Sequence, residues 1–388
     1  MEKVALLKCT EYDVDKIEEA LRKGFELLGG DAFLRRLIPH DSKVLLKPNF
    51  LSVVEKGSPI ITHYAVFEAV VRIVRKYSSN ISFGDSPGQE DTRRAAEKSG
   101  MMEIAEKYGV SYADFNREIV HCELDNPIRY RFWTVAKAAY EADVVITLPK
   151  LKTHAMMYYT GAVKNQFGCI PGGQKAQWHT KLPDAASFSR MLLDLNSVVK
   201  TSFAILDGIV AMEGNGPRNG TPKKMNTLIM GESLTAVDSA AVRLIGYDNV
   251  LSVPFLKAAY DTKWGAVLPE EIKVMGESIA SMKCEDFKLS RNAKMINFLT
   301  PGLTRLVSSL TAPDPVLEED KCIGCRLCDE ACPEKSTVIS FVENNGKTIP
   351  RWNYKKCIRC FCCQELCPKG AIATREKALS KLLGLDKR

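Results

Sequence analysis

The chain has 388 residues, a formal net charge of +7 and a sequence pI near 8.7. This length accommodates one large domain and one small domain. The basic balance suggests nucleic acid as a partner, but no long basic run interleaved with aromatic residues is present, so we do not expect nucleic-acid binding. No signal-peptide pattern follows Met1 and no apolar window is long enough to cross a membrane. We therefore expect a cytoplasmic protein without a membrane partner.

Short apolar runs alternate with helical patterns over the first part of the chain. The predicted strands cover residues 4–7, 43–47, 81–84, 144–148, 203–206 and 227–230. The predicted helices cover residues 15–28, 63–76 and 92–108. This alternation predicts an α/β fold with a largely parallel sheet flanked by helices. Ligands of such sheets collect at the carboxyl ends of the strands, so the segments that follow the strands are candidates for a site.

Five segments rich in Gly, Pro and small polar residues follow apolar runs closely. They cover residues 47–49, 84–88, 149–154, 160–165 and 213–217. Glycine permits close backbone approach, helix N-termini attract anions and lysines add positive charge, so these segments predict a site for a small anionic ligand. The candidate cofactor-binding or ligand-binding residues are Lys47, Asn49, Asp85, Ser86, Lys150, Lys164, Asn165, Glu213 and Asn215.

Lys152 and His154 are the candidate catalytic residues, because they are suited to binding or protonating a reduced product. The plainer alternative is that each segment is an ordinary turn, that the lysines are solvated and that the lone histidine is a core or polar residue. Because strand-end loops of a parallel sheet share one edge, we expect a single cleft. Its predicted lining is Lys47, Asp85, Lys152, His154, Asn165 and Glu213.

Other polar residues in these loops leave several roles open. Asp85, Asp207 and Glu213 would either balance the lysines or hold a divalent ion. Cys169 is either a nucleophile or ligand, or a buried structural thiol. No Gly-x-Gly-x-x-Gly sequence opens a helix after the first predicted strand and no Walker lysine loop is present, so flavin or nicotinamide binding is not expected.

Eight of the thirteen cysteines form two copies of the pattern Cys-x2-Cys-x2-Cys-x3-Cys-Pro near the C-terminus. This is the spacing of bacterial two-cluster ferredoxins, in which the last Cys of each run ligates the other cluster. We therefore expect two 4Fe–4S clusters. The ligands of the first would be Cys322, Cys325, Cys328 and Cys367, and those of the second Cys357, Cys360, Cys363 and Cys332.

Zinc and disulfides fit these cysteines less well than iron–sulfur clusters do. Structural zinc prefers paired Cys-x2–4-Cys units, and disulfides need an oxidising compartment. Cys362 lies between two predicted ligands, but its register fits the pattern worse than that of Cys363. With eight thiolates and two 2+ cores, the net charge would fall to about +3.

A Pro-rich joint over residues 311–315 separates the predicted domains. Residues 1–312 would form the α/β domain, and residues 313–374 a small α+β ferredoxin domain with a β-hairpin over 338–352. Residues 375–388 read as a basic helical tail that packs on the body or docks elsewhere.

The strand-end segments, in their order along the chain, resemble the domain-of-unknown-function family 362. Residues 207–208, 236–241 and 244–246 are also similar to that family, so the resemblance covers about residues 40 to 250. It implies a prokaryotic iron–sulfur protein with a shared α/β domain, to which a ferredoxin module is commonly attached. It supplies no reaction. The sequence Cys332-Pro333-Glu334-Lys335 departs from the usual Cys-Pro-x-Gly-Ala-Ile, which Cys367 keeps.

Three functions agree with these features. The first is an iron–sulfur oxidoreductase that passes electrons between a soluble redox partner and a small anionic ligand held in the α/β domain. The second is a non-enzymatic electron carrier or adaptor, with the α/β domain as a docking or ligand-sensing module. The third is a metal or cofactor maturation factor. The sequence does not decide whether the protein is an enzyme.

Overall fold

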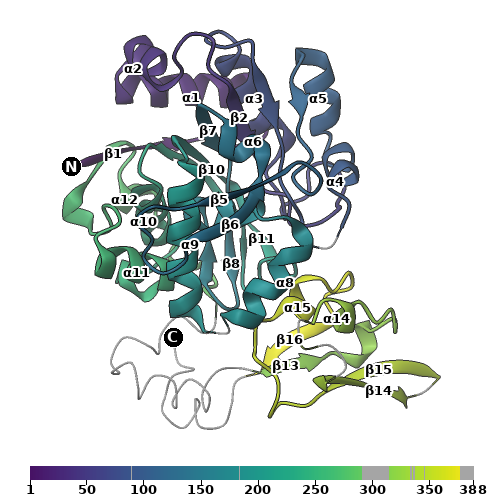
Figure 1. Cartoon of the computed structure of the whole chain (residues 1–388). Helices are drawn as coiled ribbons and strands as arrows, with labels where there is room; N and C mark the ends of the chain where they lie inside the picture. Colours follow the sequence, from purple (N-terminus) through teal and green to yellow (C-terminus); the bar gives the residue numbers. More distant parts are fainter. Residues whose placement is uncertain are drawn as a thin grey trace.

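The computed structural model describes residues 1–88, 90–182, 184–290, 314–332, 334, 337–344 and 346–375. Most of these residues form an α/β domain, and residues from Asp314 onward form a smaller unit beside it (Figure 1). The predicted helical tail lies outside the described residues except for Arg375, which ends a strand. Residues 311–313 of the predicted joint also lie outside them.

A ten-stranded sheet forms the centre of the α/β domain. Its main path has the order β12-β1-β11-β10-β7-β2-β3-β4, and β8 and β9 branch from β10. Six of its pairings are parallel and three are antiparallel, so the predicted largely parallel sheet is confirmed. The strands are β1 (Glu2–Lys8), β2 (Val44–Lys47), β3 (Ile81–Phe83), β4 (Ser111–Tyr112), β7 (Val144–Thr147), β8 (Lys150–His154), β9 (Tyr158–Thr160), β10 (Phe203–Glu213), β11 (Thr221–Gly231) and β12 (Ile272–Gly276).

Helices cover both faces of this sheet. The side chains of a strand point alternately to its two faces, and Leu45 accordingly belongs to one hydrophobic core while Val44 and Leu46 belong to another. This burial on both faces explains why the strands read as continuous apolar runs. The helices are α1 (Val14–Leu28), α2 (Gly30–Leu37), α3 (Tyr64–Val74), α4 (Thr92–Lys98), α5 (Met101–Tyr108), α6 (Lys137–Glu141), α7 (Ala162–Asn165), α8 (Gly172–Lys181), α9 (Ala185–Val199), α10 (Leu234–Leu244), α11 (Pro254–Thr262) and α12 (Ile279–Met282). A separate two-stranded sheet joins β5 (Ile119–Glu123) to β6 (Phe132–Ala136).

All six predicted strands of the α/β domain are present, and β10 and β11 are much longer than predicted. The predicted helix over residues 92–108 is instead two helices, α4 and α5. The chain turns between them at Gly100, whose φ of 79° is a left-handed conformation that glycine adopts at little cost.

The smaller unit contains two short sheets and two single-turn helices. β13 (Asp314–Leu317) pairs with β16 (Ile372–Arg375), and β14 (Ile339–Asn344) pairs with β15 (Lys347–Trp352), which confirms the predicted hairpin. α14 (Leu327–Glu330) lies in the first cysteine run and α15 (Cys362–Glu365) in the second. In Figure 1 this unit, in yellow and green, lies against the end of the α/β domain at which α8 is found.

Side-chain amides join the two units. Nδ2 of Asn219 donates a hydrogen bond of 3.1 Å to the backbone carbonyl of Gln364. Nε2 of Gln364 in turn donates to Oδ1 of Asn215. The second cysteine run therefore faces the loop that follows β10.

Candidate functional site

The cysteines of the two runs mix in space. Cys367, from the second run, lines a cavity of about 20 Å³ together with Cys322, Cys325 and Cys328 of the first run. The backbone N–H of Ala371 donates a hydrogen bond of 3.2 Å to Sγ of Cys367. This set of four thiols fits the predicted crossed ligation, in which the last Cys of one run completes the cluster of the other.

The remaining cysteines meet around Cys363. Burial raises the pKa of the Cys363 thiol well above its ordinary value, and the thiols of Cys360, Cys357, Cys328 and Cys332 raise it further. Cys328 and Cys332 of the first run are therefore both near Cys363, so thiols of the two runs mix here. Because ligating thiols must lose their protons, cluster assembly here has to release protons from a buried set.

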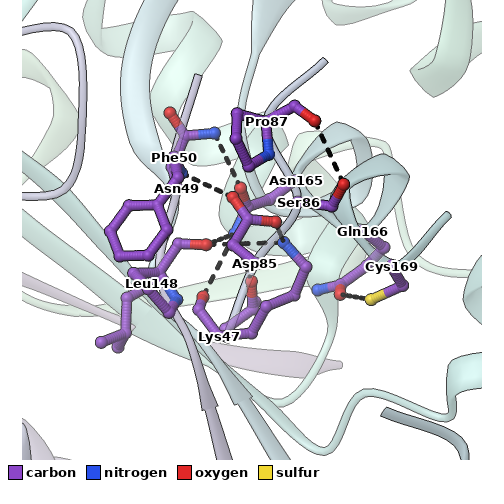
Figure 2. Close-up of polar contacts among 12 residues, drawn as sticks. Lys47, Asn49, Phe50, Asp85, Ser86, Pro87, Leu148, Asn165, Gln166 and Cys169 are labelled. Carbon is purple, nitrogen blue, oxygen red and sulfur yellow. Dashed lines mark hydrogen bonds and ion pairs between the residues drawn. The ribbon is translucent and has the colours of Figure 1, made fainter. Parts of the chain in front are cut away.

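In the α/β domain, the loops after β2 and β3 are joined by a buried ion pair. Nζ of Lys47 lies 2.8 Å from Oδ1 of Asp85, and the two side chains are 0% and 2% exposed. The other carboxylate oxygen of Asp85 accepts a hydrogen bond of 2.5 Å from the backbone N–H of Phe50. Figure 2 shows the Lys47 and Asp85 side chains pointing toward each other.

A second buried ion pair lies farther along the strand edge. Nζ of Lys150, on β8, is 2.8 Å from Oδ2 of Asp207, on β10. Lys150 also donates a hydrogen bond of 2.7 Å to the hydroxyl of Tyr12, which donates one of 2.8 Å to Oδ1 of Asp207. Burial lowers the pKa of Lys150, and Asp207 opposes this shift. This pair neutralises two predicted site charges inside the fold.

The side chains of Asn49, Asn165 and Lys152 form a hydrogen-bond network that joins the segment after β2 to α7 and β8. Nδ2 of Asn49 donates a hydrogen bond of 2.9 Å to Oδ1 of Asn165, and Nζ of Lys152 donates one of 2.6 Å to Oδ1 of Asn49. Nδ2 of Asn165 donates in turn to Oγ1 of Thr147, at 2.8 Å. The hydrogen bond from Lys152 holds its ammonium group against the Asn49 side chain.

His154 is completely buried at the end of β8. Its Nδ1 accepts hydrogen bonds of 3.1 Å from the backbone N–H groups of Met156 and Met157. These contacts make His154 the centre of a tight turn, which agrees with the plainer alternative of a core histidine.

A cavity of about 110 Å³ lies where the α/β domain meets the smaller unit. Five of the sequence-predicted residues line it: Asn49, Asp85, Ser86, Lys164 and Asn165. Lys175 and His179 of α8 line it as well, together with Phe50 and Phe167. The smaller unit contributes Ala331, Cys362 and Leu366. Ala331 directly precedes Cys332, and Cys362 lies between Cys360 and Cys363, so this wall adjoins the predicted second cluster.

The prediction of one cleft is therefore wrong in part. Asp85 and Asn165 line the cavity, but Lys47, Lys152, His154 and Glu213 do not lie among its lining residues, nor do Lys150 and Asn215. Lys150 and Lys152 lie on β8, which is itself a sheet strand next to β10. Their ammonium groups bind Asp207 and Asn49 inside the fold. Glu213 accepts hydrogen bonds from the backbone of Lys288 and from Thr221, on the far side of β10. Asp85 and Asp207 pair with two different lysines, Lys47 and Lys150, so these carboxylates balance charge, as the first alternative predicts.

Lys175 is a charged residue of the cavity that the sequence did not identify as a candidate. Its Nζ donates a hydrogen bond to the backbone carbonyl of Ser86 and lies 5.9 Å from the centre of the Phe167 ring. Burial lowers the pKa of Lys175 to about 8, which Asp85 opposes and Lys47 and Lys164 reinforce. The only signal in the sequence was the glycine pair at the start of α8, which brings the helix close to the loop after β3.

Cys169, below this helix, is a fully buried thiol. Its Sγ donates to Oε1 of Gln166 at 3.5 Å (Figure 2). Burial raises its pKa to about 12, so the thiol is neutral near pH 7. This agrees with a structural role.

Residues 44–243 match the model of a protein family described as a domain of unknown function, DUF362, and this match covers more than half of the chain. The chain belongs to the DUF362 family. Residues 321–371 also match the model of a 4Fe-4S dicluster domain, so this DUF362 protein carries a ferredoxin-type iron–sulfur module. All α/β residues that line the cavity fall within the DUF362 match, and all those of the smaller unit fall within the dicluster match.

One curated protein is similar to about two thirds of this chain. Thylakoid-associated protein sll1697 of Synechocystis sp. is 33% identical over 256 residues, which cover 66% of this chain and 78% of that protein. No helix in the described ranges of the DUF362 chain is long and apolar enough to cross a membrane.

Similar solved structures are more remote. The lactate racemase apoprotein of Thermoanaerobacterium thermosaccharolyticum aligns with a TM-score of 0.40 at 12% identity, covering 60% of this chain and 54% of its own. A Thermotoga maritima protein aligns with a TM-score of 0.35 at 12% identity, covering 53% and 52%. The DUF362 chain thus spans about half of each.

Proposed function

We propose that this protein is a cytoplasmic iron–sulfur oxidoreductase that passes electrons through two 4Fe–4S clusters to or from a small anionic ligand in the interdomain cavity. The clusters would supply one-electron transfer, and a soluble redox partner would exchange electrons with them. The protein residues would bind the ligand, exclude water and position it against the cluster-bearing wall.

The observation that carries this proposal is the composition of the cavity wall. Its lining from the α/β domain includes Lys164 and Lys175, and its lining from the smaller unit includes Ala331 and Cys362, which neighbour predicted ligands of the second cluster in the sequence. A ligand in this space would be next to a cationic surface and next to a redox centre at once. Neither a pure docking surface nor a storage ferredoxin requires that combination.

The proposal is tested by blocking the cavity. Ala176 lines the cavity from α8, and the next residue, Gln177, is exposed. Ala176→Phe should fill the space, while Gln177→Phe adds the same ring outside it. The anaerobically purified, cluster-loaded full chain would be reduced, freed of reductant and mixed with small-molecule extract from its cells, with reoxidation followed by absorbance.

We expect a component of the extract to reoxidise the wild type and Gln177→Phe at similar rates, and Ala176→Phe much more slowly. Equal rates for both variants would rule out the cavity as the site. The second candidate function is that of a ligand-sensing electron carrier. The hydrogen bond between Asn215 and Gln364, which joins the two units, favours it. It would instead show ligand binding that Ala176→Phe abolishes, without any reoxidation.

A further inference from the structure

The charged and amide side chains described at the interdomain cavity all come from one domain. Among the residues that the structure describes, the charged or amide side chains that line it belong to the α/β domain: Asn49, Asp85, Lys164, Asn165 and Lys175. The described lining residues of the smaller unit are Ala331, Cys362 and Leu366. A ligand held here would therefore have its polar end toward the α/β domain and an apolar end toward the predicted cluster.

The charges at the polar end favour an anion. Asp85 is the only acidic residue among the described lining residues, and it already pairs with Lys47 and the N–H of Phe50. Lys175 forms no ion pair with any carboxylate in the described ranges, and its one hydrogen bond there goes to the carbonyl of Ser86. An ammonium group has three donors, so two N–H groups of Lys175 are available to a ligand.

The size of the cavity and its apolar wall narrow the chemical class of the ligand further. A cavity of about 110 Å³ holds several times the roughly 30 Å³ of one water molecule, which suits a ligand of a few non-hydrogen atoms. The aromatic rings of Phe50 and Phe167 and the side chain of Leu366 offer apolar contacts that a bare inorganic anion would not use.

We propose that the cavity binds a small carboxylic acid as its carboxylate, with Lys175 as the anchoring cation and the hydrocarbon body against Ala331 and Leu366. This inference rests on the proposed function only in placing the ligand in this cavity. The shift of the Lys175 pKa to about 8 agrees with it, because a half-buried ammonium that forms no ion pair in the described ranges is a group that a bound carboxylate would stabilise.

The test uses the anaerobically purified, cluster-loaded full chain and titration calorimetry with three probes. Crotonate has the charge and a four-carbon body, crotonamide has the body without the charge, and inorganic phosphate has the charge without the body. We expect crotonate to bind, crotonamide to bind about tenfold or more weakly, and phosphate not to compete. Lys175→Met should weaken crotonate binding about ten- to a hundredfold, the range of one charge-assisted hydrogen bond.

Lys181→Met is the matched control, because Lys181 is an exposed lysine of the same helix that lies over the Trp178 ring, at 5.6 Å. Equal effects of both variants, equal binding of crotonate and crotonamide, or preferential binding of phosphate would overturn the inference. Absence of crotonate binding at millimolar concentration would do the same. The probe comparison uses wild-type protein, so it decides the question even when a variant does not fold.

Failure of this inference is distinguishable from failure of the proposed function. Lys175-dependent crotonate binding without reoxidation by any extract component would leave the carboxylate site standing and sink the oxidoreductase. Reoxidation by a neutral or cationic component, blocked by Ala176→Phe, would support the oxidoreductase and rule out the carboxylate site.

Discussion

Removing one partner of the Lys47–Asp85 ion pair should destabilise the α/β domain strongly. The side chains are 0% and 2% exposed and lie 2.8 Å apart, so each charge depends on the other for its stabilisation. In Lys47→Met, a change that nearly conserves volume, the Asp85 carboxylate would keep only the N–H of Phe50. Breaking a buried pair in this way costs about 3–5 kcal/mol.

Thermal unfolding followed by circular dichroism measures this effect. At about 2–3 °C per kcal/mol for a domain of this size, Lys47→Met should lower Tm by about 6–15 °C. The double variant Lys47→Met/Asp85→Asn removes both charges and should recover more than half of the loss, because no unpaired charge remains.

A surface pair provides the control. Lys257 and Asp261 lie 2.9 Å apart on α11, with side chains 51% and 43% exposed. Lys257→Met should change stability by about 0.5 kcal/mol or less, since exposed pairs are weak. A Tm loss for Lys47→Met no larger than that for Lys257→Met, or no recovery in the double variant, would refute the reasoning.

Three further predictions concern the clusters and Lys175. Anaerobic analysis should find about eight irons and eight acid-labile sulfides per chain, and zinc in their place would contradict the assignment. Cys367→Ser should perturb the magnetic spectrum of the first cluster and Cys332→Ser that of the second; damage confined to each residue's own run would exclude crossed ligation. Because the pKa of Lys175 is about 8 and lies below that of an ordinary lysine, amine acylation at pH 8 with mass spectrometry should modify Lys175 ahead of Lys181 wherever reagent reaches both. Burial is the main cause of this low pKa, and Asp85 partly offsets it, so Asp85→Asn should lower the pKa of Lys175 further.

Local patterns were sufficient to predict the small unit and the sheet. The cysteine spacing predicted a two-cluster module, which the dicluster match supports, and the apolar run with its turn signal predicted the hairpin between the runs. The apolar runs at β2 and β7 predicted buried strands because burial on both faces leaves no polar alternation. The break between α4 and α5 was missed because a single glycine within a helical pattern is compatible with continuation.

The cavity was less predictable because pairing across the chain decides which side chains remain available. Lys150 follows a strand, as a ligand-binding lysine would, but Asp207 lies on the adjacent strand and neutralises it. Lys175 has no motif around it, and its importance comes from α8 approaching the loop that contains Ser86. Such approaches depend on non-local packing, which spacing along the sequence does not record.

The wall formed by Ala331, Cys362 and Leu366 has a consequence for biosynthesis. The α/β residues of the cavity begin at Asn49, while its last wall comes from a segment that follows the α/β domain in the chain. We expect that segment to need its clusters to fold, because metal binding and folding are coupled in small metal-binding domains. A newly made chain without iron would thus have an α/β domain but an incomplete pocket. We expect such a chain to be unable to retain the proposed carboxylate, which would keep immature protein from sequestering it.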